Sequence, residues 1–302
     1  MTASGSWERG RQRTGLVLVL PALVVLAAVV LYPIVRSLVL SLQRSKLGPG
    51  GLQTEYAGLD QYRRMAGDET FTLALRHSAL FTVGEVVLVI AIALGAALLL
   101  HHPLGRSPIF RVILLIPWAI APVANAILWK WIYNANYGVL NAIVTGIGIT
   151  ERPVNWLGNP NLALRMLMLA DVWKSVPFIT LLLLAGLQNV PGHLYRAATV
   201  DGANAWQRFR FVTLPGLRIP LMLAVVLQTI WSFKVFDLIF VLTKAGPADA
   251  TLLLNFLAYR VSFNFLDFSY GAAIANAIFV IMLVLAMLIV RLLGPRQARR
   301  TS

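Results

Sequence analysis

Residues 195–216 read YRAATVDGANAWQRFRFVTLPG and form a short basic segment between two long apolar runs. Asp201 and Gly202 divide this segment into two parts. We expect Asp201 to cap the second part by accepting a backbone N–H, and Gly202 to supply the unusual backbone of a tight turn. The segment therefore predicts two short helices joined by a turn.

Pro191 is expected to open the first of these helices, over residues 192–200, because proline is tolerated in the first helical turn. The second is expected over residues 203–212, with apolar and basic side chains on different faces and with Pro215 ending it. Two interpretations remain open: a routine connection at the membrane surface, or a docking element for another protein. Docking would use the small residues, which let a partner backbone approach closely: Ala197, Ala198, Gly202 and Ala203.

The composition indicates a polytopic membrane protein. The chain has 302 residues, of which 58% are hydrophobic and only 13% charged, whereas soluble domains carry about 25% charged residues. The formal net charge is +14, but the basic residues lie in short connections and not in one basic stripe, which argues against nucleic-acid binding. The absence of cysteine excludes disulfides, thiolate metal sites and thiol catalysis.

Six apolar runs are each long enough to cross about 30 Å of hydrocarbon as a helix. The predicted fold class is thus an all-α polytopic membrane protein with six transmembrane helices, a transmembrane domain over 16–293 and polar tails at 1–15 and 294–302. Prolines predict kinks in the third and fourth runs, at Pro117, Pro122 and Pro177. The predicted spans are 16–42, 73–101, 109–134, 162–189, 217–242 and 270–293.

An even number of spans places both termini on one side of the membrane. The termini and the connections on their side are rich in Lys and Arg and hold only two acids, Glu8 and Asp201, whereas the opposite loops are richer in acids. Because cytoplasmic loops carry an excess of basic residues, both termini and the loop 191–216 are predicted to be cytoplasmic.

The loop also carries a spaced pattern. Arg196-Ala197-Ala198 is followed after three residues by Gly202 and later by Leu214-Pro215. This pattern resembles the EAA loop of the inner-membrane permease subunits of binding-protein-dependent ABC importers, with Arg196 in place of the family glutamate. The resemblance implies a coupling helix that docks into an ATPase subunit. The residues expected to take part are Arg196, Ala197, Ala198, Asp201, Gly202, Ala203 and Pro215.

Three further stretches resemble carbohydrate permeases of the maltose and glycerol-phosphate type. They are ILWKWIYNANYGVLN at 127–141, ADVWKSVPFITLLLLAGLQNVP at 170–191 and FKVFDLIFVLTKAGP at 233–247. The likeness extends over about residues 16–293 and implies the type I ABC importer permease fold. It also implies a multi-pass protein of a bacterial or archaeal inner membrane that imports a di- or oligosaccharide, such as trehalose or maltose.

The resemblance further implies a non-catalytic subunit. Its partners would be a second homologous permease subunit, two ATPase subunits holding ATP and Mg²⁺, an extracytoplasmic sugar-binding protein and membrane lipid. The chain itself would bind no cofactor or metal and no nucleic acid. In agreement, the sequence contains no G-x-x-x-x-G-K-[ST] phosphate loop.

Sugar binding needs aromatic rings against the apolar faces of the sugar, and amides or hydroxyls against its OH groups. The resemblance favours spans four to six as the lining of the translocation path. Taken alone, each candidate is more often a helix-packing or interfacial residue than a sugar contact. The candidates are Asn125, Trp129, Trp173, Phe178, Gln228, Trp231, Phe236, Asp237 and Asn276.

Three acids near or within the spans support an alternative, an ion-coupled secondary transporter, because intramembrane acids are costly and often functional. A third possibility is a membrane scaffold or signalling subunit. Asp171 precedes Lys174 by three residues and Asp237 follows Lys234 by three, so each acid could simply pair on its helix. Glu85 has no basic neighbour; it could bond across helices or line an aqueous path.

Overall fold

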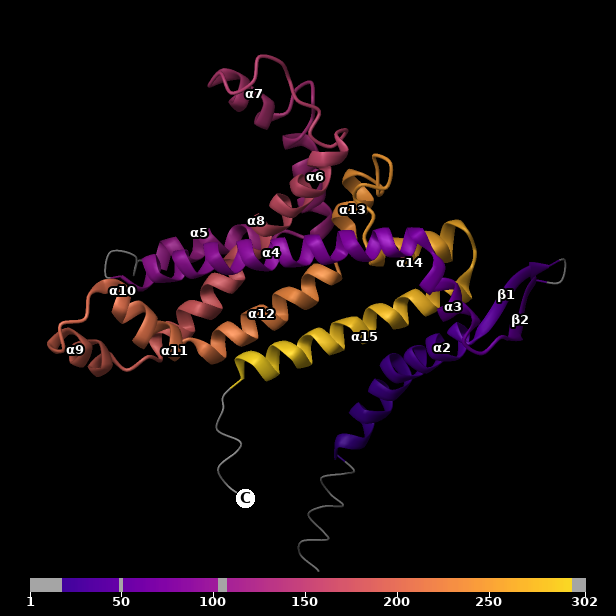
Figure 1. Ribbon diagram of the computed structural model, residues 1–302, viewed down its shortest axis with the longest axis horizontal. Coiled ribbons are helices and arrows are strands. Elements are labelled where there is room, and N and C mark those ends of the chain that lie inside the picture. The colour runs from indigo at the N-terminus through magenta and orange to yellow at the C-terminus, as the bar shows by residue number, and fades with distance from the viewer. Residues whose placement is uncertain (1–17, 49–50, 103–107, 295–302) are drawn as a thin grey trace, which may run out of the picture. The chain divides into compact units, whose positions relative to one another are not determined.

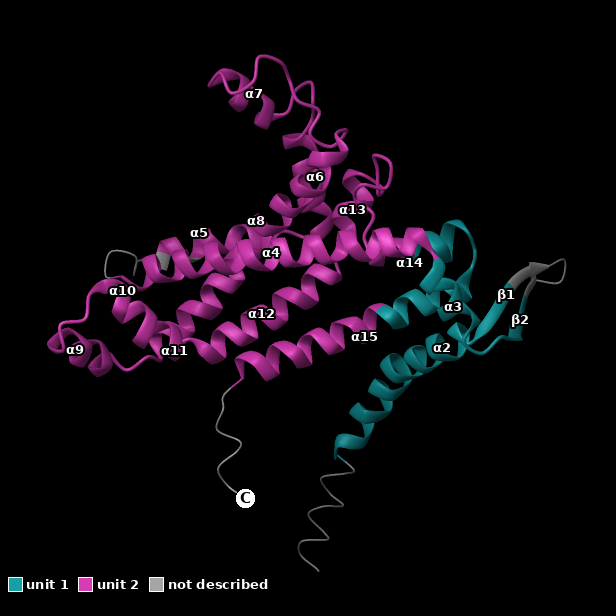
Figure 2. Cartoon of the chain, viewed as in Figure 1, with its two compact units in different colours: residues 1–67, 258–277 teal, residues 68–257, 278–302 magenta. Residues whose placement is uncertain are grey.

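A computed structural model describes residues 18–48, 51–102 and 108–294 (Figure 1). The predicted tail 1–15, and the predicted tail 294–302 beyond its first residue, lie outside this described part. The chain divides into two compact units (Figure 2). Unit 1 comprises residues 1–67 and 258–277, and unit 2 comprises residues 68–257 and 278–302.

Unit 1 contains the apolar helix Leu18–Ser41, an antiparallel hairpin and several short helical pieces. The hairpin was not predicted from the sequence; the available signal was the Gly-Pro-Gly-Gly run at 48–51, which is typical of a turn. The elements are η1 (Ala27–Leu31) and α2 (Tyr32–Ser41) within the first helix, β1 (Gln43–Gly48), β2 (Gly51–Tyr56), α3 (Asp60–Gly67), η4 (Arg260–Asn264) and the first part of α15 (Phe268–Leu293).

Polar contacts hold unit 1 together. Arg64 donates to the Asp267 carboxylate at 2.6 Å, and its guanidinium lies 4.1 Å from the centre of the Tyr270 ring. The Asn276 side chain accepts from Ser37 Oγ at 3.2 Å and donates to the Ser37 carbonyl at 3.3 Å. These bonds tie α15 to α3 and to the first helix.

Unit 2 contains most of the helices. They are α4 (Glu69–His101), α5 (Pro108–Ala119), α6 (Pro122–Ile132), α7 (Val139–Gly146), α8 (Pro160–Gln188), α9 (Gly192–Val200), α10 (Ala205–Arg208), η3 (Phe209–Thr213), α11 (Leu214–Gly216), α12 (Arg218–Phe233), α13 (Asp237–Leu242), the start of α14 (Leu254–Tyr259) and the end of α15. Of these, α4, α8 and α12 pack together and bury one shared apolar core.

Five helices are long and apolar enough to span a membrane, and the bent pair α5–α6 makes a sixth if it is counted as one span. The second span begins at Glu69, four residues before the predicted start at 73, because Asp68 caps it by accepting from the Thr70 N–H at 2.8 Å. The fourth and sixth spans lie within two residues of the predicted bounds.

The third span was predicted over 109–134 with kinks at Pro117 and Pro122, and the structure bends it sharply next to Pro122. Its halves are bent by 95° at residues 120–121. Pro122 lacks an N–H, and Ala121 before it has ψ 143°, an extended value that proline imposes on its predecessor. Pro117 and Pro177, by contrast, lie inside α5 and α8, which continue through them.

The fifth span, predicted over 217–242, is also interrupted. Helix α12 ends at Phe233 and α13 begins at Asp237, so residues 234–236 are not helical. Both interruptions lie in unit 2, and α6 packs against α13. The two interrupted segments therefore lie next to each other.

The packing of α8 against α12 depends on Gly186. A Cβ atom at this position would lie 2.5 Å from Cγ of the rigid Pro220 ring. We expect Gly186→Val to lower the free energy of unfolding by about 1–3 kcal/mol through overpacking. The measurement is the apparent unfolding temperature in detergent. Gly95→Val is the matched control, because nothing lies within 4 Å of the corresponding Cβ in α4; an equal drop in both variants would contradict this account.

Candidate functional site

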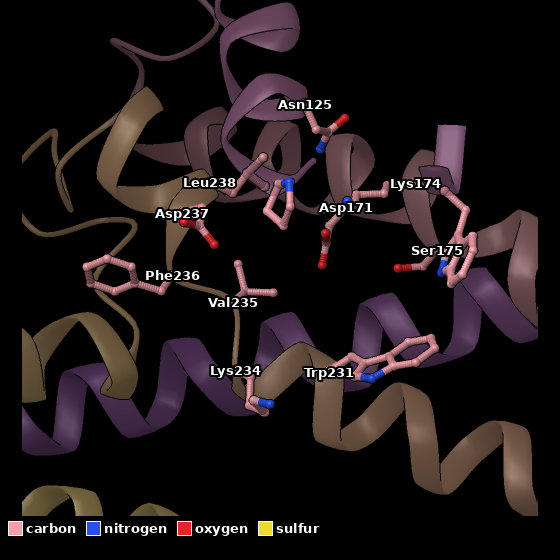
Figure 3. Close-up of a pocket in the computed structure, with 12 residues that line it drawn as sticks. Asn125, Asp171, Lys174, Ser175, Trp231, Lys234, Val235, Phe236, Asp237 and Leu238 are labelled. Carbon is pink, nitrogen blue, oxygen red and sulfur yellow. The ribbon is translucent and has the colours of Figure 1, made fainter. Parts of the chain in front are cut away.

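A cavity of about 290 Å³ lies in unit 2, where the two interrupted spans meet α8 (Figure 3). The carboxyl groups of Asp171 and Asp237 and the hydroxyl of Ser175 point toward its middle. Its lining combines indole and phenyl rings with charged and amide groups: Trp118, Pro122, Asn125, Asp171, Lys174, Ser175, Trp231, Lys234, Val235, Phe236, Asp237 and Leu238.

The break in the third span shapes one wall. Lys174 Nζ on α8 donates to the Ile120 carbonyl at 2.5 Å. That carbonyl lies at the bend, where the regular hydrogen bonds of the helix are interrupted. A backbone group without a hydrogen-bond partner in a membrane interior costs several kcal/mol of stability. The lysine thus stabilises the bend that opens the cavity.

The predicted ion pairs at three-residue spacing are not formed. Among the described residues, ion pairs join neither Lys174 to Asp171 nor Lys234 to Asp237. Lys174 is occupied by the Ile120 carbonyl. The second pair fails because the chain leaves the helix between Lys234 and Asp237.

Glu85 bonds across helices, which is one of the two possibilities left open by the sequence. Its side chain is fully buried on α4 and accepts hydrogen bonds from Gln228 Nε2 at 2.5 Å and from Ser232 Oγ, both on α12. This residue therefore connects α4 to α12.

Aromatic rings form two groups at the cavity. Phe178 lies between Trp118, at a centroid distance of 5.3 Å, and Trp231, at 5.2 Å. Phe236 stacks on Phe240 at 5.5 Å. Such rings present flat apolar faces that fit the C–H faces of a ring-shaped ligand.

Asn125 supplies an unpaired hydrogen-bond acceptor in this wall. It is buried, with 1% relative exposure, and lines the cavity. Its Oδ1 atom has no hydrogen-bond partner among the described residues. Buried polar groups are normally satisfied, so this oxygen is available to a donor inside the cavity.

The candidates predicted from the sequence fall into three groups. Asn125, Trp231, Phe236 and Asp237 line the cavity. The second group lies in unit 2 but outside the lining, and comprises Trp129, Trp173, Phe178 and Gln228. The third is Asn276, which belongs to unit 1 and bonds to Ser37.

Sequence reasoning missed several lining residues. Trp118 precedes the break by two residues, and Ser175 lies one helical turn after Asp171, so both positions follow from signals present in the sequence. Val235 and Leu238 line the cavity only because α12 ends at Phe233, and no glycine or proline marks that end.

The segment that opened the sequence analysis folds as a helix, a turn and a second helical stretch. Helix α9 ends at Val200, and Gly202 has φ +77°, as its predicted role in a tight turn requires. The Tyr195 hydroxyl bonds to Thr213 Oγ1 at 3.0 Å, and Arg208 donates to Thr199 Oγ1 at 3.2 Å. These bonds hold the two helical parts against each other.

The prediction for the first helix is confirmed, because α9 covers Gly192–Val200 and directly follows Pro191. Two details of this segment differ from expectation. Asp201 ends α9 and does not cap α10; Asn204 does so. Its side chain accepts from the Gln207 N–H at 2.9 Å, and Gln207 Oε1 accepts from the Asn204 N–H at 2.8 Å.

Two physical reasons account for these differences. The turn extends through Ala203, so the cap of α10 is Asn204, three residues after the predicted Asp201. Pro215 does not end the second helical stretch, because it lies in the first turn of α11, where its missing N–H costs no hydrogen bond.

One face of the segment is open. Arg196, Ala197, Asp201 and Gly202 are exposed, while Ala198 and Ala203 are partly buried. Three large apolar residues on the same segment are also exposed, with relative exposures of 87% for Val200, 66% for Trp206 and 69% for Phe211. Among the described residues, Arg196 has no ion-pair partner.

The model of the family described as binding-protein-dependent transport system inner membrane component matches residues 90–299. This chain belongs to that family. The permease is 38% identical over 271 residues to the trehalose/maltose transport system permease protein MalF of Thermococcus litoralis, covering 90% of each chain. It is 33% identical to the lactose transport system permease protein LacF of Rhizobium radiobacter, covering 95% of this chain and 96% of the relative.

The fold of the permease is similar to that of solved importers. A bacterial alginate ABC transporter, crystallised in complex with an alginate pentasaccharide-bound periplasmic protein, matches with a TM-score of 0.80 and 19% identity over 94% of this chain and 95% of the other. The all-α polytopic fold class of an ABC importer permease is thus confirmed. Family membership does not favour the ion-coupled secondary transporter or the scaffold.

The capping assignment can be tested directly. We expect Asn204→Ala to destabilise the start of α10 by about 1 kcal/mol, which corresponds to roughly fivefold faster amide exchange in that turn. Hydrogen–deuterium exchange over residues 204–213 measures this. Asp201→Ala is the control and should leave exchange there nearly as in the native protein; the opposite ranking would restore Asp201 as the cap.

Proposed function

We propose that this chain is the transmembrane subunit of an ATP-driven importer of a di- or oligosaccharide, with the cavity of unit 2 forming its part of the substrate path. The observation that carries the proposal is the buried, unpartnered Asn125 Oδ1 in a cavity walled by Trp118 and Trp231. An aromatic wall with free hydrogen-bonding groups suits a ligand with apolar ring faces and many hydroxyls. The sugars in the names of the relatives support the same substrate class.

Ser175 and Asp171 extend this polar set. Both lie on α8, and the cavity has the volume of a small-ligand pocket at the low end of the usual range, which begins at about 300 Å³. A second permease subunit would supply the other half of the path, so one chain need not enclose the whole sugar. An extracytoplasmic sugar-binding protein would deliver it.

The exposed face of residues 195–216 is the proposed docking surface for an ATPase subunit. The chain would hydrolyse no ATP; the ATP and Mg²⁺ would be held by two partner ATPase subunits. The small residues at the turn, together with exposed Val200 and Arg196, would meet the partner. We place this surface in the cytoplasm, with both termini, in a bacterial or archaeal inner membrane.

Helix α12 connects this surface to the cavity. Leu217, directly after α11, is fully buried in the shared core, and Arg218 donates to the Leu293 carbonyl at 2.8 Å. From there α12 runs without interruption to Phe233, next to the cavity residues 234–238. Closure of the ATPase subunits would therefore move α12 and switch the cavity between inward- and outward-facing states, driven by the different nucleotide affinities of those states.

The cavity assignment is tested by Ser175→Leu in the assembled transporter reconstituted with its binding protein. The larger side chain would fill the space that the ligand needs, and a loss of only about 1.4 kcal/mol of binding reduces affinity tenfold. We expect sugar uptake to fall at least that much. Ala185→Leu, on the exposed side of α8, is the control. Normal uptake by the Ser175 variant would remove the cavity from the path.

The coupling assignment is tested by Gly202→Trp. Nothing lies within 4 Å of a Cβ at this position, so the ring would project outward and block docking. The control is Gly202→Asn, because asparagine tolerates φ > 0 better than most residues and adds little bulk. We expect sugar-stimulated ATP hydrolysis to be lost in the Trp variant and kept in the Asn variant. Equal hydrolysis in both would argue against docking here.

A further inference from the structure

The second helical stretch of the segment 195–216 carries exposed side chains that the proposed docking at the turn does not use. This stretch comprises α10, η3 and α11. Trp206 and Phe211 are strongly exposed, and Arg210 and Leu214 are exposed as well. We call these four residues the surface patch. Exposed apolar groups of this size, gathered on one short stretch, indicate a contact surface.

Helix α9 does not cover the surface patch. The contacts of the second stretch with α9 come from other residues, because Thr213 Oγ1 bonds to the Tyr195 hydroxyl and Arg208 donates to Thr199 Oγ1. None of the four patch side chains makes a hydrogen bond or an ion pair with another described residue. The patch is therefore open to a partner other than the one proposed for the turn at Gly202.

The surface patch lies beside the start of a membrane span. Arg218 begins this candidate span, and Leu214 lies four residues before it, about 6 Å along a helix. Figure 1 shows that α10 and α11 do not follow the axis of α12 but turn away from it. Exposed apolar residues continue into the first two turns of α12, as Ile219 and Leu223. We therefore place the patch at the depth of the lipid headgroups, where tryptophan is enriched.

The charge of the segment fits an anionic surface. Arg210 has no ion-pair partner among the described residues, and its guanidinium lies 5.9 Å from the centre of the Phe211 ring. A phospholipid offers the matching groups, a phosphate for the guanidinium and acyl chains for the ring. The loop 191–218 carries four arginines and one acid, and anionic cytoplasmic lipids attract such basic segments.

We propose that the surface patch binds the anionic phospholipids of the cytoplasmic leaflet and so anchors the second helical stretch to the membrane surface. Trp206, Phe211 and Leu214 enter the headgroup layer. Arg210 pairs with a lipid phosphate. The ATPase subunit then docks on α9 and the turn at Gly202 alone. The inference rests on the proposed cytoplasmic placement of this loop, and it divides the exposed face of the segment between two partners.

The occupant of the patch is tested with a spin label, because the chain contains no cysteine. Phe211→Cys carries a nitroxide in the assembled transporter, with cysteine-free partner subunits, in nanodiscs of phosphatidylcholine mixed equally with phosphatidylglycerol. Power saturation compares relaxation by oxygen, which concentrates in lipid, with relaxation by a water-soluble nickel complex. We expect oxygen to dominate at position 211. Val200→Cys, at an exposed residue of the docking side, is the control and should be shielded from both reagents.

The lipid class is tested by affinity. The detergent-purified transporter is titrated with short-chain phosphatidylglycerol, and with short-chain phosphatidylcholine as the neutral comparison. We expect Arg210→Gln to bind phosphatidylglycerol about fivefold more weakly, because it loses one cationic group at the lipid surface. Arg210→Lys keeps the charge and should bind as the native protein does. Arg196→Gln, at an exposed arginine of α9, is the matched control and should also bind normally.

The outcomes separate the possible occupants. Dominant relaxation by nickel at position 211 would show that water covers the patch, and shielding from both reagents would show that a protein does; either result overturns the inference. Unchanged affinity in Arg210→Gln, or an equal loss in Arg196→Gln, would overturn the contact between Arg210 and an anionic lipid. A label at position 200 that is open to nickel would contradict the proposed ATPase docking, while dominance of oxygen at position 211 would still support the lipid contact. Should Arg210→Gln not assemble, the label at position 211 decides alone.

Discussion

The hydrocarbon of a membrane offers no hydrogen bonds, so every polar group inside the permease must find its partner in the protein. Glu85 shows how strongly this constraint acts. Its side chain is fully buried on α4, and its hydrogen-bond partners Gln228 and Ser232 lie on α12. Both helices contribute to the apolar core of unit 2, so this polar group helps to fix the position of α12 against α4.

The cavity exists because two spans do not remain helical. Each interruption releases backbone groups that lipid could not satisfy, and the protein supplies replacements. Lys174 bonds to the carbonyl of Ile120 at one break, and Asn255 donates to the carbonyl of Lys234 at the other, at 3.1 Å. Irregular backbone is tolerated at membrane depth where it is buried in protein or lines a cavity, and here it does both.

Much of this architecture follows from the sequence, since apolar length alone locates the spans and the Pro122 break has a proline to mark it. The rest depends on long-range contacts. The partner Gln228 lies 143 residues from Glu85, and no local pattern connects them. No glycine or proline marks the end of α12 at Phe233. The prediction that Lys234 and Asp237 lie on one face of a helix and pair was therefore wrong. Asp201 and Asn204 are equally good caps by type, and only the length of the turn distinguishes them.

The bond from Lys174 to Ile120 has a consequence for anyone who wishes to redesign this transporter. Lys174 lines the cavity and also stabilises the bend at Ile120, so both ligand binding and folding constrain which side chain can stand at this position. Most substitutions of Lys174 selected for a new substrate would also remove the hydrogen bond to the Ile120 carbonyl and impair folding. The folded variants would therefore represent only a few of the possible side chains. Ser175, the adjacent lining residue on α8, makes no such backbone bond among the described contacts and is the better starting position for diversification.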